Sequence, residues 1–101
     1  MISFNLGSDV YLESKVKVNK APALISGVSG EVHRDGRYLF PFAARYSGNT
    51  ISCVIIGTSF TTIGDYEAKF QVSLDTMGMR EHSIPFKITK SVLGKKRQVR
   101  E

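Results

Sequence analysis

The chain has 101 residues, and 42% of them are hydrophobic, which is the length and balance of one globular domain. No apolar run comes near the roughly 20 residues that a membrane-spanning helix needs, so the sequence predicts no such helix. The net charge of +5 belongs to one end, because residues 1–86 hold eight basic and eight acidic side chains, whereas residues 87–101 hold six basic side chains against Glu101.

The first residues alternate apolar and polar side chains, with Ile2, Phe4 and Leu6 on one parity. Residues of one parity share a face of a strand. Two interpretations stay open: the segment adds a strand to the sheet of a neighbouring subunit, or it forms the first strand of the domain's own sheet. The segment has neither a basic start nor an apolar stretch of signal-peptide length, so we expect a chain that is not secreted.

The alternation of residues 10–18 predicts a strand with one apolar and one charged face. The apolar parity consists of Val10, Leu12, Val16 and Val18, and the opposite parity of Tyr11, Glu13, Lys15 and Lys17. Ser14 interrupts the apolar parity, which is typical of a bulge or bend. Residues 19–27 are expected to be a loop or short strand between sheets.

Asp35-Gly36 is a two-residue turn signal that predicts a hairpin between residues 30–34 and 37–46. The second arm carries an apolar row on one face: Tyr38, Phe40, Phe42, Ala44 and Tyr46. Aromatic rows on a sheet can stack nucleic-acid bases. We favour a place in the core, because a chain without tryptophan needs these rings there.

Residues 50–56 are apolar on both parities and predict a central strand covered on both sides. Cys53 is the only cysteine, so no disulfide can form within the chain, and its apolar neighbours predict a buried thiol of structural use. Residues 57–62 are polar except for Phe60, which we expect to be buried.

The most regular alternation lies in residues 65–74, which predict a strand, and it is followed by a second strand over residues 80–90. A short connection with Gly78 joins the two as an antiparallel hairpin. Pro85 has no amide hydrogen, so it is expected at an edge or a bulge.

Six to seven short strands with frequent turn signals predict an all-β fold, a single antiparallel β-sandwich of the immunoglobulin-like kind. A small β-barrel is the alternative. We assign residues 1–90 to the sandwich and residues 91–101 to a basic tail.

Residues 64–90 resemble the end of immunoglobulin-like modules in bacteriophage tail, baseplate and fibre proteins. The resemblance lies in the sequences GDYEAKFQVSL of residues 64–74 and REHSIPFKITK of residues 80–90. In such modules a Gly-x-Tyr precedes the alternating residues, and the tyrosine hydroxyl holds a corner of the fold. The resemblance implies a β-sandwich without catalytic residues. Because the long linker and distal receptor-binding portion of fibre proteins are absent from these 101 residues, it implies a small accessory or connecting subunit.

We expect no enzyme, no cofactor and no metal site, since no catalytic or phosphate-binding motif occurs in the sequence. His33 and His82 lie near strand ends and are expected to be solvated or to make ordinary hydrogen bonds.

The favoured hypothesis is a virion protein of a phage-like particle, assembled in the host cytoplasm, that docks on other structural proteins and on copies of itself, with no membrane role. Its expected docking residues are Ile2, Phe4 and Leu6 for strand addition, and Lys95, Lys96, Arg97 and Arg100 for charge pairing. The alternative is a nucleic-acid-binding module that uses the same four cations. An adaptor that binds a peptide at a sheet edge is a third hypothesis.

Overall fold

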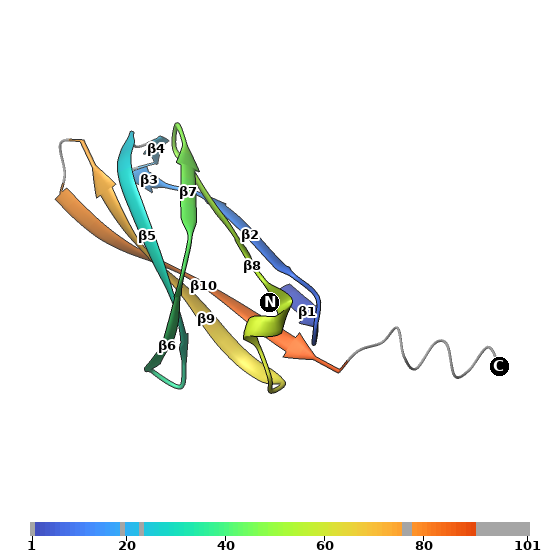
Figure 1. The fold of residues 1–101 in the computed structure, drawn as a ribbon. Coiled ribbons are helices and arrows are strands. Elements are labelled where there is room, and N and C mark those ends of the chain that lie inside the picture. Colours follow the sequence, from blue (N-terminus) through green and yellow to red (C-terminus); the bar gives the residue numbers. More distant parts are fainter. Residues whose placement is uncertain (1, 19, 23, 76–77, 91–101) are drawn as a thin grey trace, which may run out of the picture.

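The computed structural model describes residues 2–18, 20–22, 24–75 and 78–90 (Figure 1). They form two packed β-sheets and a small β-hairpin. The larger sheet has the order β1 (Ile2–Asn5), β10 (Gly78–Thr89), β9 (Gly64–Leu74), β5 (Ile25–Arg34) and β6 (Arg37–Phe42). The smaller sheet has the order β2 (Val10–Lys15), β8 (Thr50–Ile55) and β7 (Ala44–Ser47). The hairpin pairs β3 (Lys17–Val18) with β4 (Ala21–Pro22).

The all-β sandwich predicted from the sequence is confirmed. The two strand orders are those of an immunoglobulin-like sandwich, in which the chain alternates between a larger and a smaller sheet. The inner faces bury one continuous apolar core: Val10, Leu12, Val16, Ile25, Val32, Ile51, Cys53, Ile55, Phe60, Tyr66, Ala68, Phe70, Val72, Leu74, Phe86 and Ile88. The barrel alternative is not what forms, because the two sheets remain separate.

The hairpin of β9 and β10 is the longest pairing and holds the centre of the core. Its antiparallel register runs from Gly78 opposite Leu74 to Ile88 opposite Gly64. All five apolar residues of the predicted β9 row are buried, and Phe70 and Phe86 are fully so. Strict alternation therefore placed this strand correctly.

The first segment forms the domain's own strand β1, which runs parallel to β10 with Ile2 opposite Phe86. Of the two interpretations of this segment, the structure has the second. The pairing is parallel, which differs from the expected fully antiparallel sandwich. A strand at the start of the chain has no hairpin to fix its direction, so it can pair either way.

The hairpin of β5 and β6 turns at Asp35 (φ 53°) and Gly36 (φ 77°), and positive φ at both residues is the signature of a type I′ turn. The hairpin prediction is confirmed, but β5 starts at Ile25, so part of the expected loop of residues 19–27 is strand. The side chain of Ile25 is buried, and this burial extends the strand.

The predicted single arm over residues 37–46 is wrong, because the chain changes sheets between β6 and β7. Phe40, Phe42 and Ala44 pack against the core, whereas Tyr38 and Tyr46 are exposed. The Phe42 ring occupies the place where a side chain would stand at Gly30, its neighbour on β5.

Strand β8 is the centre of its sheet as expected, but it is covered on one side only. Ile51, Cys53 and Ile55 face the core, whereas Val54 is 56% exposed and Ile56 is 63% exposed. The prediction of cover on both sides is wrong, because the described residues place no further layer over the smaller sheet. In residues 50–56, the apolar residues of the outward parity are therefore exposed to solvent.

Candidate functional site

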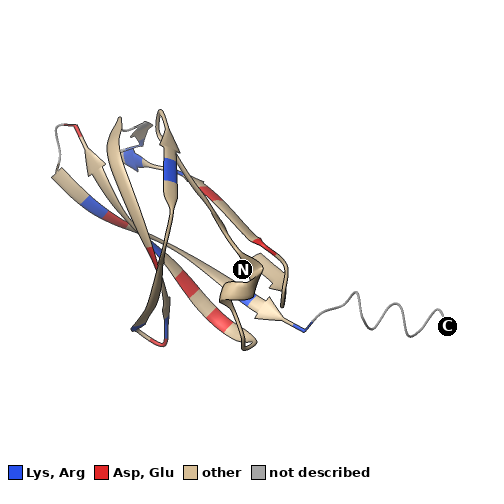
Figure 2. Ribbon diagram, in the orientation of Figure 1, with Lys and Arg blue, Asp and Glu red and all other residues tan. Residues whose placement is uncertain are grey.

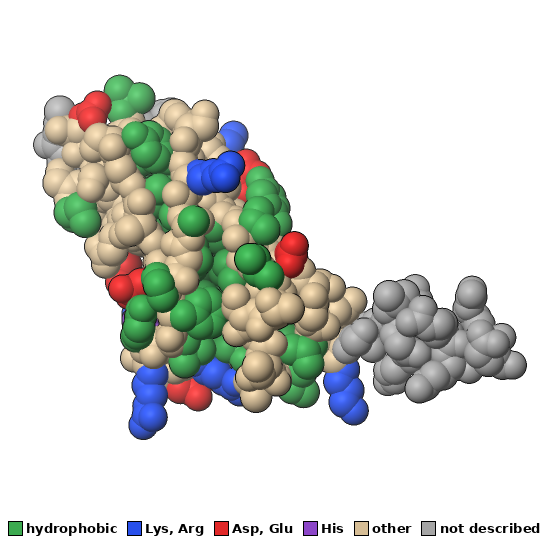
Figure 3. Space-filling view, in the orientation of Figure 1, with side chains coloured by type: hydrophobic (Ala, Val, Ile, Leu, Met, Phe, Trp, Pro, Cys, Tyr) green, Lys and Arg blue, Asp and Glu red, His purple; other side chains and the backbone are tan. Residues whose placement is uncertain are grey.

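The outward residues of the smaller sheet form the candidate site, which we call the outer face. It comprises Tyr11, Glu13 and Lys15 of β2, Thr50, Ser52 and Val54 of β8, Arg45 and Ser47 of β7, and the flanking residues Ala43 and Ile56. Period-two geometry puts the strand residues there, since they alternate along their strands with core residues, and Ala43 and Ile56 continue the alternation just outside β7 and β8. Hydrophobic side chains gather over this sheet in Figure 3. Among them, Tyr11 is 53% exposed.

Three rows cross the outer face, and the last of them consists of Lys15, Thr50 and Ser47. In the first, Tyr11 lies opposite Val54. In the second, Glu13 and Arg45 both lie opposite Ser52, one on each side of β8. Figure 2 shows an acidic residue on β2, a basic residue on β7 and no charge on β8 between them, and Lys15 at the end of β2 lies in the next row.

Tyr11 and Glu13 act as one acidic unit. The Tyr11 hydroxyl donates a hydrogen bond of 2.6 Å to Oε1 of Glu13. This bond to a carboxylate, followed by the smaller effect of desolvation, raises the pKa of Tyr11 above its ordinary value. Arg45 forms no ion pair with any residue that the structure describes. Lys15 likewise forms no ion pair with any described residue, so the outer face carries one acidic unit and two unmatched cations.

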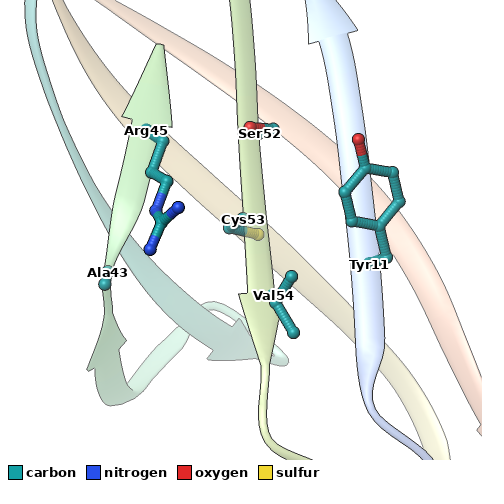
Figure 4. A pocket seen from close by; sticks show the side chains of 6 residues that line it. All are labelled: Tyr11, Ala43, Arg45, Ser52, Cys53 and Val54. Carbon is teal, nitrogen blue, oxygen red and sulfur yellow. The ribbon is translucent and has the colours of Figure 1, made fainter.

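A shallow hollow of about 250 Å³ lies in the outer face between β7 and β2 (Figure 4). Its lining residues are Tyr11, Ala43, Arg45, Ser52, Cys53 and Val54. The Arg45 side chain runs along β7 toward Ala43, whose small side chain leaves space at this level. The hollow offers an apolar floor beside a guanidinium group.

Cys53 lines the hollow but its side chain belongs to the core. The residue is 2% exposed, and desolvation raises the pKa of the thiol to about 11. A thiol with that pKa is protonated near neutral pH, and only the thiolate is a strong nucleophile. The prediction of a buried thiol is confirmed.

Tyr66 forms the corner expected from the Gly-x-Tyr pattern. Its hydroxyl donates to the backbone oxygen of Thr62 at 2.7 Å. Arg34 Nη1 donates to the Tyr66 hydroxyl at 3.1 Å and to Oγ1 of Thr62 at 2.6 Å, and the guanidinium carbon lies 5.0 Å from the ring centroid. Gly64 adopts φ 137°, and a Cβ atom there would overlap the Arg34 guanidinium, so glycine fits both requirements.

The two histidines make ordinary hydrogen bonds, as predicted. Nε2 of His33 lies 3.0 Å from Oε1 of Glu31, and Nε2 of His82 lies 2.9 Å from the Ser14 hydroxyl. Within residues 2–90, apart from the undescribed positions, no three His, Cys, Asp or Glu side chains form a group that could hold a metal ion.

The predicted docking residues are only partly visible in the structure. Phe4 and Leu6 pack against the core, and Ile2 is 48% exposed. Lys95, Lys96, Arg97 and Arg100 lie outside the described residues. The sequence reasoning missed the outer face, although the apolar residues on both parities of 50–56 were its signal.

An open sheet edge accompanies the outer face. Strand β1 pairs only with residues 86–89 of β10, so in the described part of the chain residues 78–85 have a neighbour on one side alone. Pro85 lies in this open stretch, directly before β1 begins, which agrees with its predicted edge position.

The comparisons with known proteins give little further information. No protein-family model matches the chain, and no curated protein matches it. The chain is similar to part of a solved structure, the twitchin kinase region from C. elegans (Fn31-NL-kin-CRD-Ig26), with 20% sequence identity and a TM-score of 0.49. The match covers 86% of this chain and 14% of that one, so the chain spans a small part of that protein's length. No helix among the described residues is long and apolar enough to cross a membrane.

Proposed function

We propose that this protein is a non-catalytic assembly subunit that works by binding other proteins through its surface, and that it belongs to a phage-like particle as a tail, baseplate or capsid accessory component. The observation that carries the proposal is the outer face. There a directly paired Tyr11 and Val54, with Ile56 beyond them, leave large apolar side chains in water. Contiguous apolar residues with a polar rim are typical of protein interaction sites.

The assignment to a particle is supported by the resemblance of residues 64–90 to bacteriophage tail, baseplate and fibre modules. Tyr66 of that segment forms the corner, together with Thr62 just before the segment and Arg34 of β5. In this proposal, the open edge at residues 78–85 and the termini with Ile2, Lys95, Lys96, Arg97 and Arg100 supply further contacts to other subunits, and the host cytoplasm is the place of assembly.

The experiment is to follow the untagged full-length chain in a host that produces the particles, with an antibody against it, through density-gradient fractionation. We expect the chain to sediment with the particles and to stay bound at high salt. A chain found only in the free-protein fractions contradicts the proposal. A parallel strain that lacks residues 91–101 tests the tail separately, since unchanged incorporation removes the tail from the mechanism.

A second candidate function, a nucleic-acid-binding β module, is favoured by the six basic side chains of residues 87–101. It predicts affinity that falls steeply with salt and is lost when Lys95, Lys96, Arg97 and Arg100 are changed to glutamine. A filter-binding titration at two salt concentrations measures this. Binding no tighter than that of a generic basic peptide contradicts it.

A further inference from the structure

We propose that the outer face binds the outer face of a second copy of this chain, with the two copies related by a two-fold axis that runs along β8. This inference rests on the proposed function as an assembly subunit and adds to it one surface and one partner. Three features of the outer face lead to it: the placement of charge, the placement of large and small side chains, and the apolar residues along the axis.

The charges are self-complementary under this axis, since the third outward charge, Lys15, meets the uncharged Ser47 of the other copy. Glu13 and Arg45 lie in one row on opposite sides of Ser52. A two-fold axis along the central strand exchanges the two sides of the face and leaves each row at its own level. Glu13 of each copy therefore meets Arg45 of the other, which gives two reciprocal ion pairs. If the second copy were rotated by a further 180° about the normal to the face, Glu13 would no longer lie opposite Arg45.

The shapes are complementary in the same way. Tyr11 is large and lies on the β2 side, whereas Ala43 is small and lies on the β7 side, where the hollow is. The same axis places the Tyr11 ring of each copy over Ala43 of the other, beside the Arg45 guanidinium. Arginine stacks favourably on aromatic rings, and the Glu13 carboxylate is already hydrogen-bonded to Tyr11. Arg45 thus contacts the whole acidic unit of the partner.

The residues on the axis are suited to self-contact. Val54 of β8 and Ile56, directly after β8, are both more than half exposed and would each meet their own counterpart. Ser52 lies between the charged positions and carries no charge to oppose itself. Face-to-face packing with roughly aligned strands is a standard arrangement of two sheets, at a spacing of about 10 Å.

The contact is small, so the dimer is weak. Three strands about 4.8 Å apart and about six residues long give a footprint of roughly 300 Å², well below the ~800 Å² per partner of a standard stable interface. We expect a dissociation constant on the order of 0.1 mM for the free protein. Neighbouring subunits in a particle have effective concentrations in the millimolar range, and the contact forms there.

The test uses sedimentation equilibrium of the full-length chain from about 10 μM to about 1 mM, with two single charge reversals. Glu13→Arg places two cations in the row that crosses Ser52, and Arg45→Glu places two carboxylates there. Each variant alone should have a dissociation constant at least about tenfold weaker than the unchanged chain. An equimolar mixture of the two should associate again, because both cross-pairs are then of opposite charge.

Val54→Asp is a third variant, since it places two carboxylates against each other on the axis, and Met79→Asp on β10 is its matched control, with a side chain 62% exposed. The first should abolish the dimer and the second should leave it unchanged. Wild-type protein that stays monomeric at 1 mM overturns the inference, as does a mixture that fails to associate.

These results are separable from those on the proposed function. Particles that still incorporate the Arg45→Glu chain, together with a wild-type chain that does not dimerise, overturn the inference and leave the assembly role standing. A dimer that obeys the charge rules, from a chain never found in particles, supports the inference and overturns the particle role.

Discussion

The two sheets share one core but differ sharply in the surfaces they turn outward. The larger sheet carries a mixed polar and charged surface in which complementary side chains face each other: Glu31 lies opposite Lys69, and the His33 imidazole opposite Glu67. Two further contacts run along the strands, from His33 to Glu31 and from Lys69 to Glu67. The outer face of the smaller sheet has apolar side chains, an opposite pair of charges separated by a strand, and Lys15 at its end.

This difference separates a solvated surface from a contact surface. Complementary polar side chains that already contact each other within one copy gain little interaction energy from a partner. An exposed apolar row beside a separated cation and carboxylate is left unsatisfied within one copy. Inward and outward residues on neighbouring positions of the same strands therefore give the sharpest tests.

The largest expected effect comes from removing an inward aromatic side chain. Phe70 is fully buried and its ring centroid lies 5.2 Å from that of Phe42, so Phe70→Ala should lower the free energy of unfolding by about 3–5 kcal/mol. The outward Val54→Ala is the control, with an expected change within about 0.5 kcal/mol. Urea denaturation measures both. Equal effects would mean that inward residues of the sandwich and outward residues of the smaller sheet do not differ in burial.

The inward thiol of β8 should make stability depend on alkaline pH. Desolvation raises the pKa of Cys53 to about 11 from an ordinary 9.0, so between these values the unfolded chain loses a proton that the folded chain keeps. The contribution is complete below pH 9 and is lost as the pH rises toward 11, a fall on the order of 2 kcal/mol. Urea denaturation at a series of pH values measures it.

The Cys53→Ala variant is the control for that titration, because tyrosines also lose protons in this range. It should start from a lower stability, since a buried atom is removed, and should lack the Cys53 part of the decline. A decline that is identical in both proteins contradicts the assignment to Cys53.

A smaller effect distinguishes two tyrosines. Tyr66 is buried and its hydroxyl holds the Thr62 backbone, whereas the Tyr11 hydroxyl bonds an exposed carboxylate. Tyr66→Phe should lower the free energy of unfolding by about 1–2 kcal/mol, since it removes a buried hydrogen bond and leaves its partner unsatisfied. Tyr11→Phe should change it by less than about 0.5 kcal/mol, and chemical denaturation compares the two. A Tyr11 effect as large as that of Tyr66 would argue against this distinction.

Alternation was sufficient to predict those parts of the fold where one face of a strand is buried and the other is polar. Residues 65–74 and 80–90 meet this condition, and the turn residues Asp35-Gly36 specified their hairpin independently of the rest. The corner at Tyr66 was predicted through its Gly-x-Tyr pattern.

Alternation failed where the two parities did not differ or the chain left its sheet. In residues 50–56 both parities are apolar, and the pattern alone does not distinguish a second buried layer from an open surface. In residues 37–46 the row continues smoothly across Ala43, although the chain changes sheets there. The pairing of Glu13 and Arg45 about Ser52 depends on strand order, which the spacing of residues along one chain does not contain.

The smallest expected effect lies on the outer face and concerns the proton of Tyr11. Its pKa is raised above 10.0 because the hydroxyl donates to Glu13, and Glu13→Gln should bring it back toward that value. Ring resonances followed by NMR across alkaline pH resolve Tyr11 from the other tyrosines. At high protein concentration the partner's Arg45 would add positive charge beside the ring and lower this pKa, because a nearby cation favours the phenolate. A pKa of Tyr11 that is the same in dilute and concentrated wild-type protein would argue against Arg45 as the neighbour, whereas a decrease that disappears in Arg45→Glu would place it there.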